Sequence, residues 1–112
     1  MRSTLIGLAL SVILPSVALA KDNAAWRASH PRRAEVNDRL KNQNERIREG
    51  RENGTLSKQQ AQQLHAEDHN IRTQEREMAA QNGGHLTKTE QRALNQEENR
   101  SSKQIHDEKH GQ

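Results

Sequence analysis

The chain has 112 residues, with 18 Lys and Arg against 15 Asp and Glu, a single aromatic residue (Trp26) and no cysteine. The lack of cysteine excludes disulfide scaffolds, thiolate zinc sites and thiol catalysis. Charges of both signs alternate every few residues and aromatic stacking surfaces are lacking, so we expect no nucleic-acid binding.

Residues 1–20 have the pattern of a secretory signal peptide. Arg2 supplies the positive start, an apolar run extends from Leu5 to Leu19, and small residues precede the expected cleavage after Ala20. The apolar run has about fifteen residues, whereas a membrane-spanning helix needs about twenty. We therefore expect a periplasmic or secreted protein with no membrane span once the signal is cleaved.

The next segment, 21–30, shows no periodicity and is expected to be a disordered N-terminus. A helical domain is predicted at 31–110. Its first helix, about 32–49, follows from Pro31 at a first helical position, with Ser29 or His30 as the cap. Apolar residues then recur at spacings of four and seven, at Val36, Leu40 and Ile47. Gly50 and the Asn53-Gly54 pair are expected to end this helix.

Two capping boxes predict the starts of two further helices. Ser57 with Gln60, and Thr87 with Glu90, each place a hydroxyl and an acceptor side chain three residues apart. The second helix should run to Gln81, since neither Gly nor Pro interrupts it. Its apolar residues lie seven apart, at Leu64, Ile71 and Met78. The third helix should carry Leu94 and Ile105 and fray toward Gly111.

The two junctions between helices resemble each other at an offset of thirty residues, which indicates an internal repeat. In each, a glycine is followed by a leucine two residues later and then by the capping box. We expect the glycines to set the turns, the leucines to be buried and the capping residues to start the next helix. The structural residues are Gly54, Leu56, Ser57, Gln60, Gly84, Leu86, Thr87 and Glu90.

The sequence therefore predicts an all-α fold of three helices joined by two glycine turns, with a marginal core and frayed termini. Only nine residues from Lys21 onward are Val, Ile or Leu, which is few for a self-sufficient core. We expect contact with a protein partner or self-association to complete it. The expected contact stripe comprises Val36, Leu40, Leu64, Ile71, Met78 and Leu94.

The helix-turn-helix junctions resemble the EF-hand family, whose loop has an acidic residue first, a glycine sixth, an aliphatic eighth and a glutamate twelfth. Over residues 36–108 this frame is better preserved than the ligands, because Arg51 and Ala79 stand where carboxylates belong. The resemblance implies an EF-hand-like pair with lost or weak calcium affinity. Its remaining oxygen ligands would be Glu49, Asn53, Ser57 and Glu90.

The same junctions resemble a second family, the small periplasmic helical proteins related to the chaperone Spy and the stress protein CpxP. That family carries the pattern Leu-Thr-x-x-Gln. Here the pattern reads Leu56-Ser57-Lys58-Gln59-Gln60 and Leu86-Thr87-Lys88-Thr89-Glu90, each departing at one place. The resemblance implies a periplasmic chaperone or stress protein.

Two histidine pairs offer a further metal hypothesis. His65 with His69, and His106 with His110, are each four residues apart, so each pair can face one way on a helix and hold zinc. The carboxylates have basic residues three and four positions away, which is typical of a solvated helix surface rather than a catalytic site. We therefore expect a non-enzyme that acts by protein contact and needs no cofactor, with weak calcium or zinc binding as the alternative.

Overall fold

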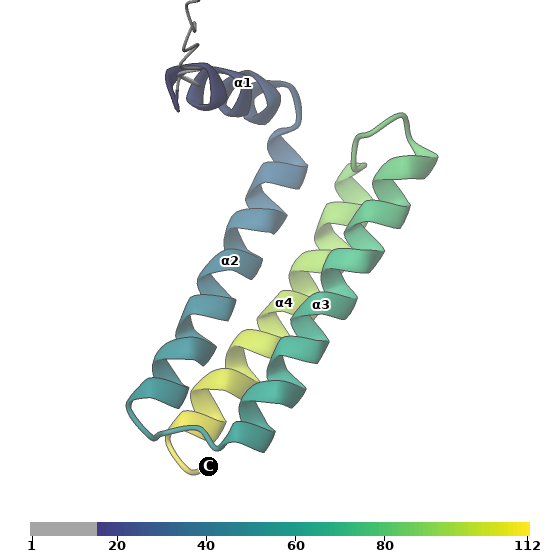
Figure 1. The fold of residues 1–112 in the computed structure, drawn as a ribbon. Coiled ribbons are helices and arrows are strands. Elements are labelled where there is room, and N and C mark those ends of the chain that lie inside the picture. The colour runs from purple at the N-terminus through teal and green to yellow at the C-terminus, as the bar shows by residue number, and fades with distance from the viewer. Residues whose placement is uncertain (1–15) are drawn as a thin grey trace, which may run out of the picture.

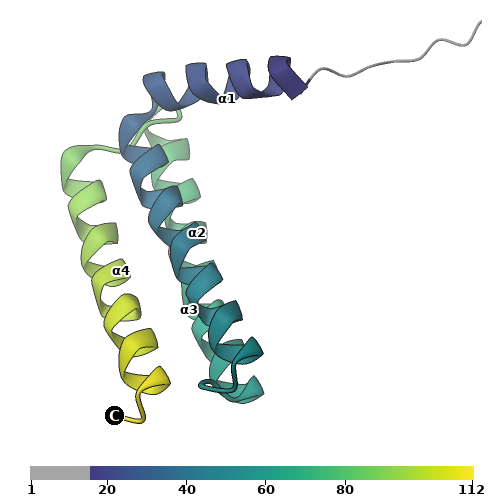
Figure 2. The same cartoon turned by 90° about the vertical axis from the view of Figure 1, so that its left-hand side faces the viewer.

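The computed structural model describes the backbone of residues 16–112 and the side chains from residue 23 onward. Its elements are α1 (Ser16–Ser29), α2 (Pro31–Glu52), α3 (Lys58–Gln81) and α4 (Lys88–Lys109), and these described residues contain no strand. The predicted all-α class is confirmed, with four helices rather than three. Figure 1 shows α2, α3 and α4 side by side in an antiparallel bundle, and Figure 2 shows α1 projecting sideways from the start of α2.

The predicted signal peptide lies outside the described residues, apart from the backbone of 16–20, which belongs to the start of α1. In the part of the chain that the structure describes, no helix is both long enough and apolar enough to cross a membrane.

α1 corrects the expectation of a disordered segment at 21–30. Three stacked rings fix its last turn. The ring centroids of Trp26 and His30 are 4.7 Å apart, and those of His30 and His85, in the loop before α4, are 4.5 Å apart. Arg27 forms a two-point ion pair with Asp38 of α2, at 2.6 and 2.9 Å. The stack of His30 on His85 joins residues far apart in the chain, and none of these contacts depends on apolar periodicity, so the sequence pattern gave no sign of them.

Gly50 does not end α2, which continues to Glu52. A Cβ atom at Gly50 would lie 2.6 Å from Cδ1 of Leu56, so the missing side chain is what allows Leu56 to fold back onto the helix. The amide of Leu56 donates to the carbonyl of Gly50 at 3.0 Å. The turn itself is made at Gly54, whose φ of +81° lies in the left-handed region that favours glycine.

Both predicted capping boxes are confirmed. Ser57 Oγ accepts from the amide of Gln60 at 3.0 Å, and Gln60 Oε1 accepts from the amide of Ser57 at 2.8 Å. Thr87 and Glu90 repeat the arrangement at 3.1 and 2.9 Å. Each box satisfies two helix-terminal amides that would otherwise lack a partner, which explains why α3 and α4 begin where the sequence predicted.

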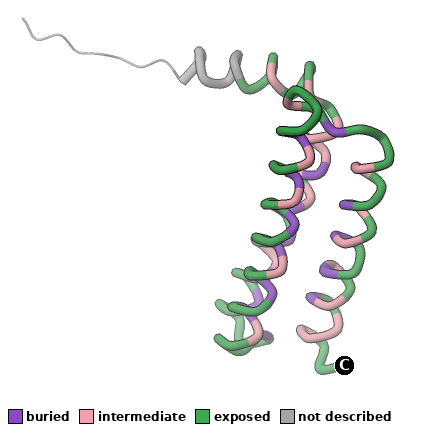
Figure 3. Tube along the Cα trace, turned by 90° about the vertical axis from the view of Figure 1, so that its right-hand side faces the viewer, coloured by how far each residue is buried: buried purple, intermediate pink, exposed green. Residues whose placement is uncertain are grey.

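All nine Val, Ile and Leu residues after residue 20 are buried inside the bundle, none more than 3% exposed. They pack into two clusters along the bundle, and Figure 3 shows buried positions recurring along all three helices. Five members of the predicted contact stripe belong to this core, and Met78 packs half-buried against it. The stripe is therefore an internal seam rather than an exposed partner surface, because three helices of this length bury all their aliphatic residues against one another.

Candidate functional site

The seam is divided into two apolar clusters with polar residues between them. The cluster nearer α1 contains Val36, Leu40, Ile71, Ala79, Leu86 and Leu94. The cluster at the opposite end contains Ile47, Leu56, Ala61, Leu64 and Ile105. In every helix of the bundle, a polar residue occupies the turn that separates the two clusters. We call Gln43, Asp68, Glu98 and Ser101 the central polar layer; each is at most 5% exposed.

The two carboxyl groups of the central polar layer lack hydrogen-bond partners. None of the four oxygens of Asp68 and Glu98 accepts a hydrogen bond from a described residue, and neither does Gln43 Oε1. The amide nitrogen of Gln43 is satisfied, because Nε2 donates to the backbone carbonyl of Glu98 at 2.8 Å. An ionised carboxylate that is buried without hydrogen bonds destabilises the fold, so such groups are normally paired, bound to a metal or protonated.

Burial raises the pKa of Asp68 to about 7, with repulsion from Glu67 adding to the rise and attraction from Arg46 opposing it. Burial likewise raises the pKa of Glu98 to about 8. Arg39 opposes that rise, whereas the negative charges of Glu35, Asp68 and Glu97 add to it. Both groups therefore hold protons at mildly acidic pH. A protonated carboxyl is also a hydrogen-bond donor, which suits the unpartnered oxygen of Gln43.

Glu75 shows how a buried carboxylate in the same bundle is satisfied when a partner is present. It is fully buried, and Arg33 donates to its two oxygens at 2.5 and 3.2 Å. Arg33 also lies 5.4 Å above the ring of Trp26 and reaches the carbonyl of Gly84 at 3.4 Å. The ion pair joins α2 to α3, and through Arg33 it also contacts the ring of Trp26 in α1. The central polar layer has no comparable pair.

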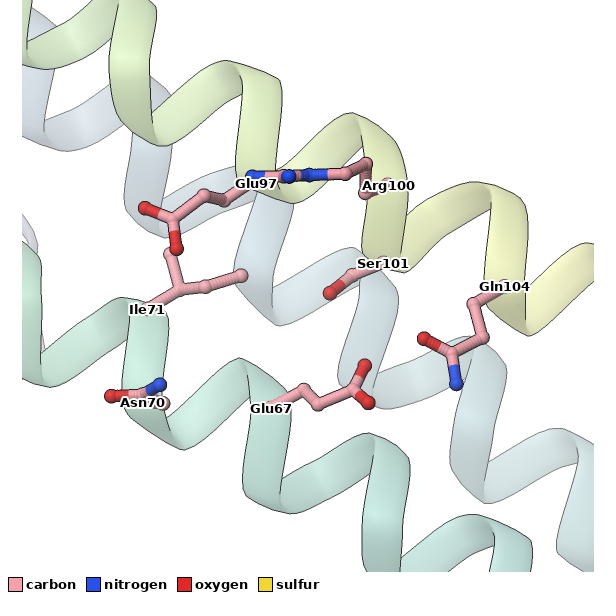
Figure 4. A pocket seen from close by; sticks show the side chains of 7 residues that line it. All are labelled: Glu67, Asn70, Ile71, Glu97, Arg100, Ser101 and Gln104. Carbon is pink, nitrogen blue, oxygen red and sulfur yellow. The ribbon is translucent and has the colours of Figure 1, made fainter.

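A groove of about 210 Å³ runs between α3 and α4 beside the central polar layer (Figure 4). Ile71 and Ser101 are its buried residues, while Glu67 and Glu97 are half-buried. Its full lining is Glu67, Asn70, Ile71, Glu97, Arg100, Ser101 and Gln104. Ser101 belongs to both the layer and the groove, so the groove adjoins the layer.

The loop oxygens predicted to bind calcium are mostly engaged by neighbouring groups of the chain. Asn53 Oδ1 accepts from the amide of Thr55 at 3.1 Å and from its hydroxyl at 2.7 Å. The side chains of Ser57 and Glu90 are held in the two capping boxes. Glu49 is exposed on α2, and no hydrogen bond joins it to these oxygens. Glu90 belongs to the junction before α4, at the opposite end of the bundle from the other three, so the structure does not bring all four residues together.

The histidine pairs also make contacts other than chelation. His65 Nδ1 lies 3.0 Å from Asn44 Oδ1, and His69 is exposed. The rings of His106 and His110 are 4.1 Å apart, with His110 Nδ1 2.7 Å from the carbonyl of His106. Among the residues that the structure describes, no group of three or more His, Cys, Asp or Glu is placed to hold a metal ion.

Sequence reasoning missed the central polar layer. The signal was present, because buried residues in a helical bundle alternate at spacings of three and four. Between Leu64 and Ile71, seven apart, one position must also face inward, and it holds Asp68. The equivalent inward position after Leu94 holds Glu98. These acids were interpreted as surface charge because most acids on helices are exposed.

Comparison with known protein families, with curated proteins and with solved structures finds no match to this chain.

Proposed function

We propose that this chain is a small exported helical protein that acts by contact with other proteins, without catalysis, in the periplasm or outside the cell. The proposed contact surface is the internal apolar seam, presented when the helices part. The observation that carries the proposal is the interruption of this seam by Asp68 and Glu98, two buried carboxyls that accept no hydrogen bond from the described residues. A bundle with such a centre is less stable in its closed form than one with an apolar or paired centre.

The closed surface supports this choice of contact site. No Val, Ile or Leu among the described residues is exposed, and the outer faces of the helices carry interspersed charges of both signs. Large apolar patches are the usual mark of a surface that binds proteins. Here the closed bundle leaves no such patch in the described part. An apolar partner segment would therefore find matching surface only in the seam.

The class of partner follows from the shape of the seam. It is a narrow apolar strip along three helices, and an amphipathic helix can replace one of them by placing its own apolar residues in the strip. Unfolded or partly folded proteins expose segments of this kind. The proposal thus agrees with the resemblance to exported chaperones and stress proteins.

The test is suppression of aggregation of an unfolding client protein by the purified chain. Because the chain lacks cysteine, a Glu35→Cys, Gln91→Cys variant provides a controlled closure. These two side chains contact each other at 2.8 Å between α2 and α4, the two helices that no short loop joins. A short bismaleimide link should close the bundle and abolish suppression. The matched control is the same variant with each cysteine separately capped by N-ethylmaleimide.

Suppression by the capped form and not by the linked form supports the proposal. Equal suppression by both forms would show that contact does not use the seam. Failure of both forms and of the unmodified protein would remove the chaperone class.

A further inference from the structure

The two unpartnered carboxyl groups occupy equivalent places in two antiparallel helices. Asp68 follows the capping residue Ser57 at the same distance as Glu98 follows Thr87. Each lies close to the midpoint of its helix, and midpoints of antiparallel neighbours are adjacent. The negative charge of Asp68 is accordingly among the groups that act on Glu98. Closing α3 against α4 therefore brings two acids together in the interior.

The cations near these acids donate their hydrogen bonds to other groups. Arg39 of α2 forms an ion pair with Glu98 Oε1 at 3.6 Å, without a hydrogen bond, and donates instead to Asn99 Oδ1 at 2.6 Å. Arg46, the cation that acts on Asp68, donates to the hydroxyl and the carbonyl of Ser102 at 2.7 and 3.1 Å.

Further acids face the layer from all three helices and add repulsion. They are Glu35 of α2, Glu67 of α3 and Glu97 of α4. The surroundings therefore leave both carboxylates poorly compensated when they are ionised.

A proton on each carboxyl removes this difficulty more simply than a metal ion does. A protonated carboxyl is neutral, loses little by burial and carries one hydrogen-bond donor. A calcium ion would need six to eight oxygens, and two arginines next to the site would repel it.

We propose that the central polar layer is a proton-operated latch: protons on Asp68 and Glu98 keep α3 and α4 closed against α2, and loss of the protons opens the apolar seam. The inference rests on the proposed function for what the opened seam binds. The latch itself rests on the burial and the missing hydrogen bonds of the layer and does not depend on any partner.

The direction of the latch follows from linkage. Burial raises the pKa of both groups, so the closed form binds protons that the open form releases, and closure is favoured at low pH. Release of two protons on opening makes the ratio of open to closed molecules rise about a hundredfold per pH unit. The ratio changes with pH in this way only at pH values above the pKa values of the open form and below those of the closed form. In the closed form the two pKa values are about 7 and about 8.

The experiment follows exposure of the seam in the purified full chain, without any partner, by the fluorescence of Nile red, a neutral dye that brightens on apolar surface. Between about pH 5 and about pH 9 the unmodified protein should change from low to high fluorescence. The Asp68→Asn, Glu98→Gln variant keeps the shape of the layer but cannot ionise, so its fluorescence should stay low throughout. The matched control is Glu49→Gln, Glu77→Gln, which removes the same charge from two exposed positions that do not act on the layer and should open as the unmodified protein does.

The proposal is overturned if the unmodified protein shows no change with pH, or if the layer variant follows the same curve as the unmodified protein. It is also overturned if calcium or zinc closes the bundle again at alkaline pH, because a metal site would then explain the unpartnered oxygens. If the double variant fails to fold, the single variants decide: each should reduce the dependence to about tenfold per pH unit. An unchanged hundredfold dependence in both would refute the latch.

This test is independent of client binding. A pH-dependent seam without client binding would leave the latch intact and remove the proposed function. Client binding by a protein whose seam exposure does not change with pH would remove the latch and leave the proposed function intact.

Discussion

Raising the pH should destabilise the folded protein steeply through the neutral range. The folded state holds protons on Asp68 and Glu98 with pKa values of about 7 and about 8, against ordinary values of 3.8 and 4.5. A group whose pKa is raised by folding stabilises the fold fully below its unfolded pKa, and this contribution is lost as the pH rises through the folded pKa. The stabilising contribution of the two carboxyls is therefore lost gradually, in a window between about pH 4 and about pH 8.

The magnitude follows from the sizes of the two shifts. At about 1.4 kcal/mol per pKa unit, Asp68 accounts for roughly 4 kcal/mol and Glu98 for roughly 5 kcal/mol. Together these approach the total stability of an ordinary small domain, roughly 5–15 kcal/mol. The bundle should therefore open, and admit water to the layer, before the full penalty is reached. In the middle of the window the free energy of unfolding should fall by about 2.7 kcal/mol per pH unit.

Urea unfolding followed by circular dichroism, at half-unit steps of pH, measures this slope. The exposed pairs Arg27–Asp38 and Lys103–Asp107 lower the pKa values of their aspartates, so their contribution is lost only at more acidic pH. They do not interfere with the window. A free energy of unfolding that stays constant or rises between about pH 5 and about pH 8 would refute the reasoning.

Three further predictions concern the frame that holds the layer. Gly50→Ala should lower the free energy of unfolding by about 1–3 kcal/mol through the clash with Leu56, although alanine ordinarily favours a helix; a stability gain in urea unfolding would show that Leu56 is not packed there. Thr87→Ala should lower it by about 1 kcal/mol and speed amide exchange in the first turn of α4, and unchanged exchange would contradict the capping box. Glu75→Gln should cost about 3 kcal/mol because it leaves the charge of Arg33 partly buried without its partner; a loss below about 1 kcal/mol would mean that solvent already screens this pair.

The sequence was informative where structure depends on neighbouring residues. Each capping box needs only a hydroxyl and an acceptor three residues apart, and both predicted helix starts are confirmed. The spacing of seven between Leu64 and Ile71 correctly predicted one buried face for α3. Such features are determined within one or two helical turns.

Contacts between distant segments could not be found in the same way. Gly50 was interpreted as a helix end because glycine weakens helices, whereas it is retained inside α2 by the approach of Leu56. Trp26 stacks on His30 and His30 on His85, which lies in the loop between α3 and α4. The buried acids were missed for another reason, namely that the average behaviour of acidic residues outweighed the heptad position that each one occupies.

The account depends most directly on the protonation of Asp68 and Glu98 in the folded protein. Carboxyl carbon chemical shifts, recorded by nuclear magnetic resonance through a pH titration and assigned with the Asp68→Asn and Glu98→Gln variants, report it without reference to stability or to any partner. The account predicts two carboxyl groups that titrate near 7 and near 8. Titration of both groups below about pH 5, with the helices intact, would show that the layer is solvated and would contradict the latch and the energetic argument together.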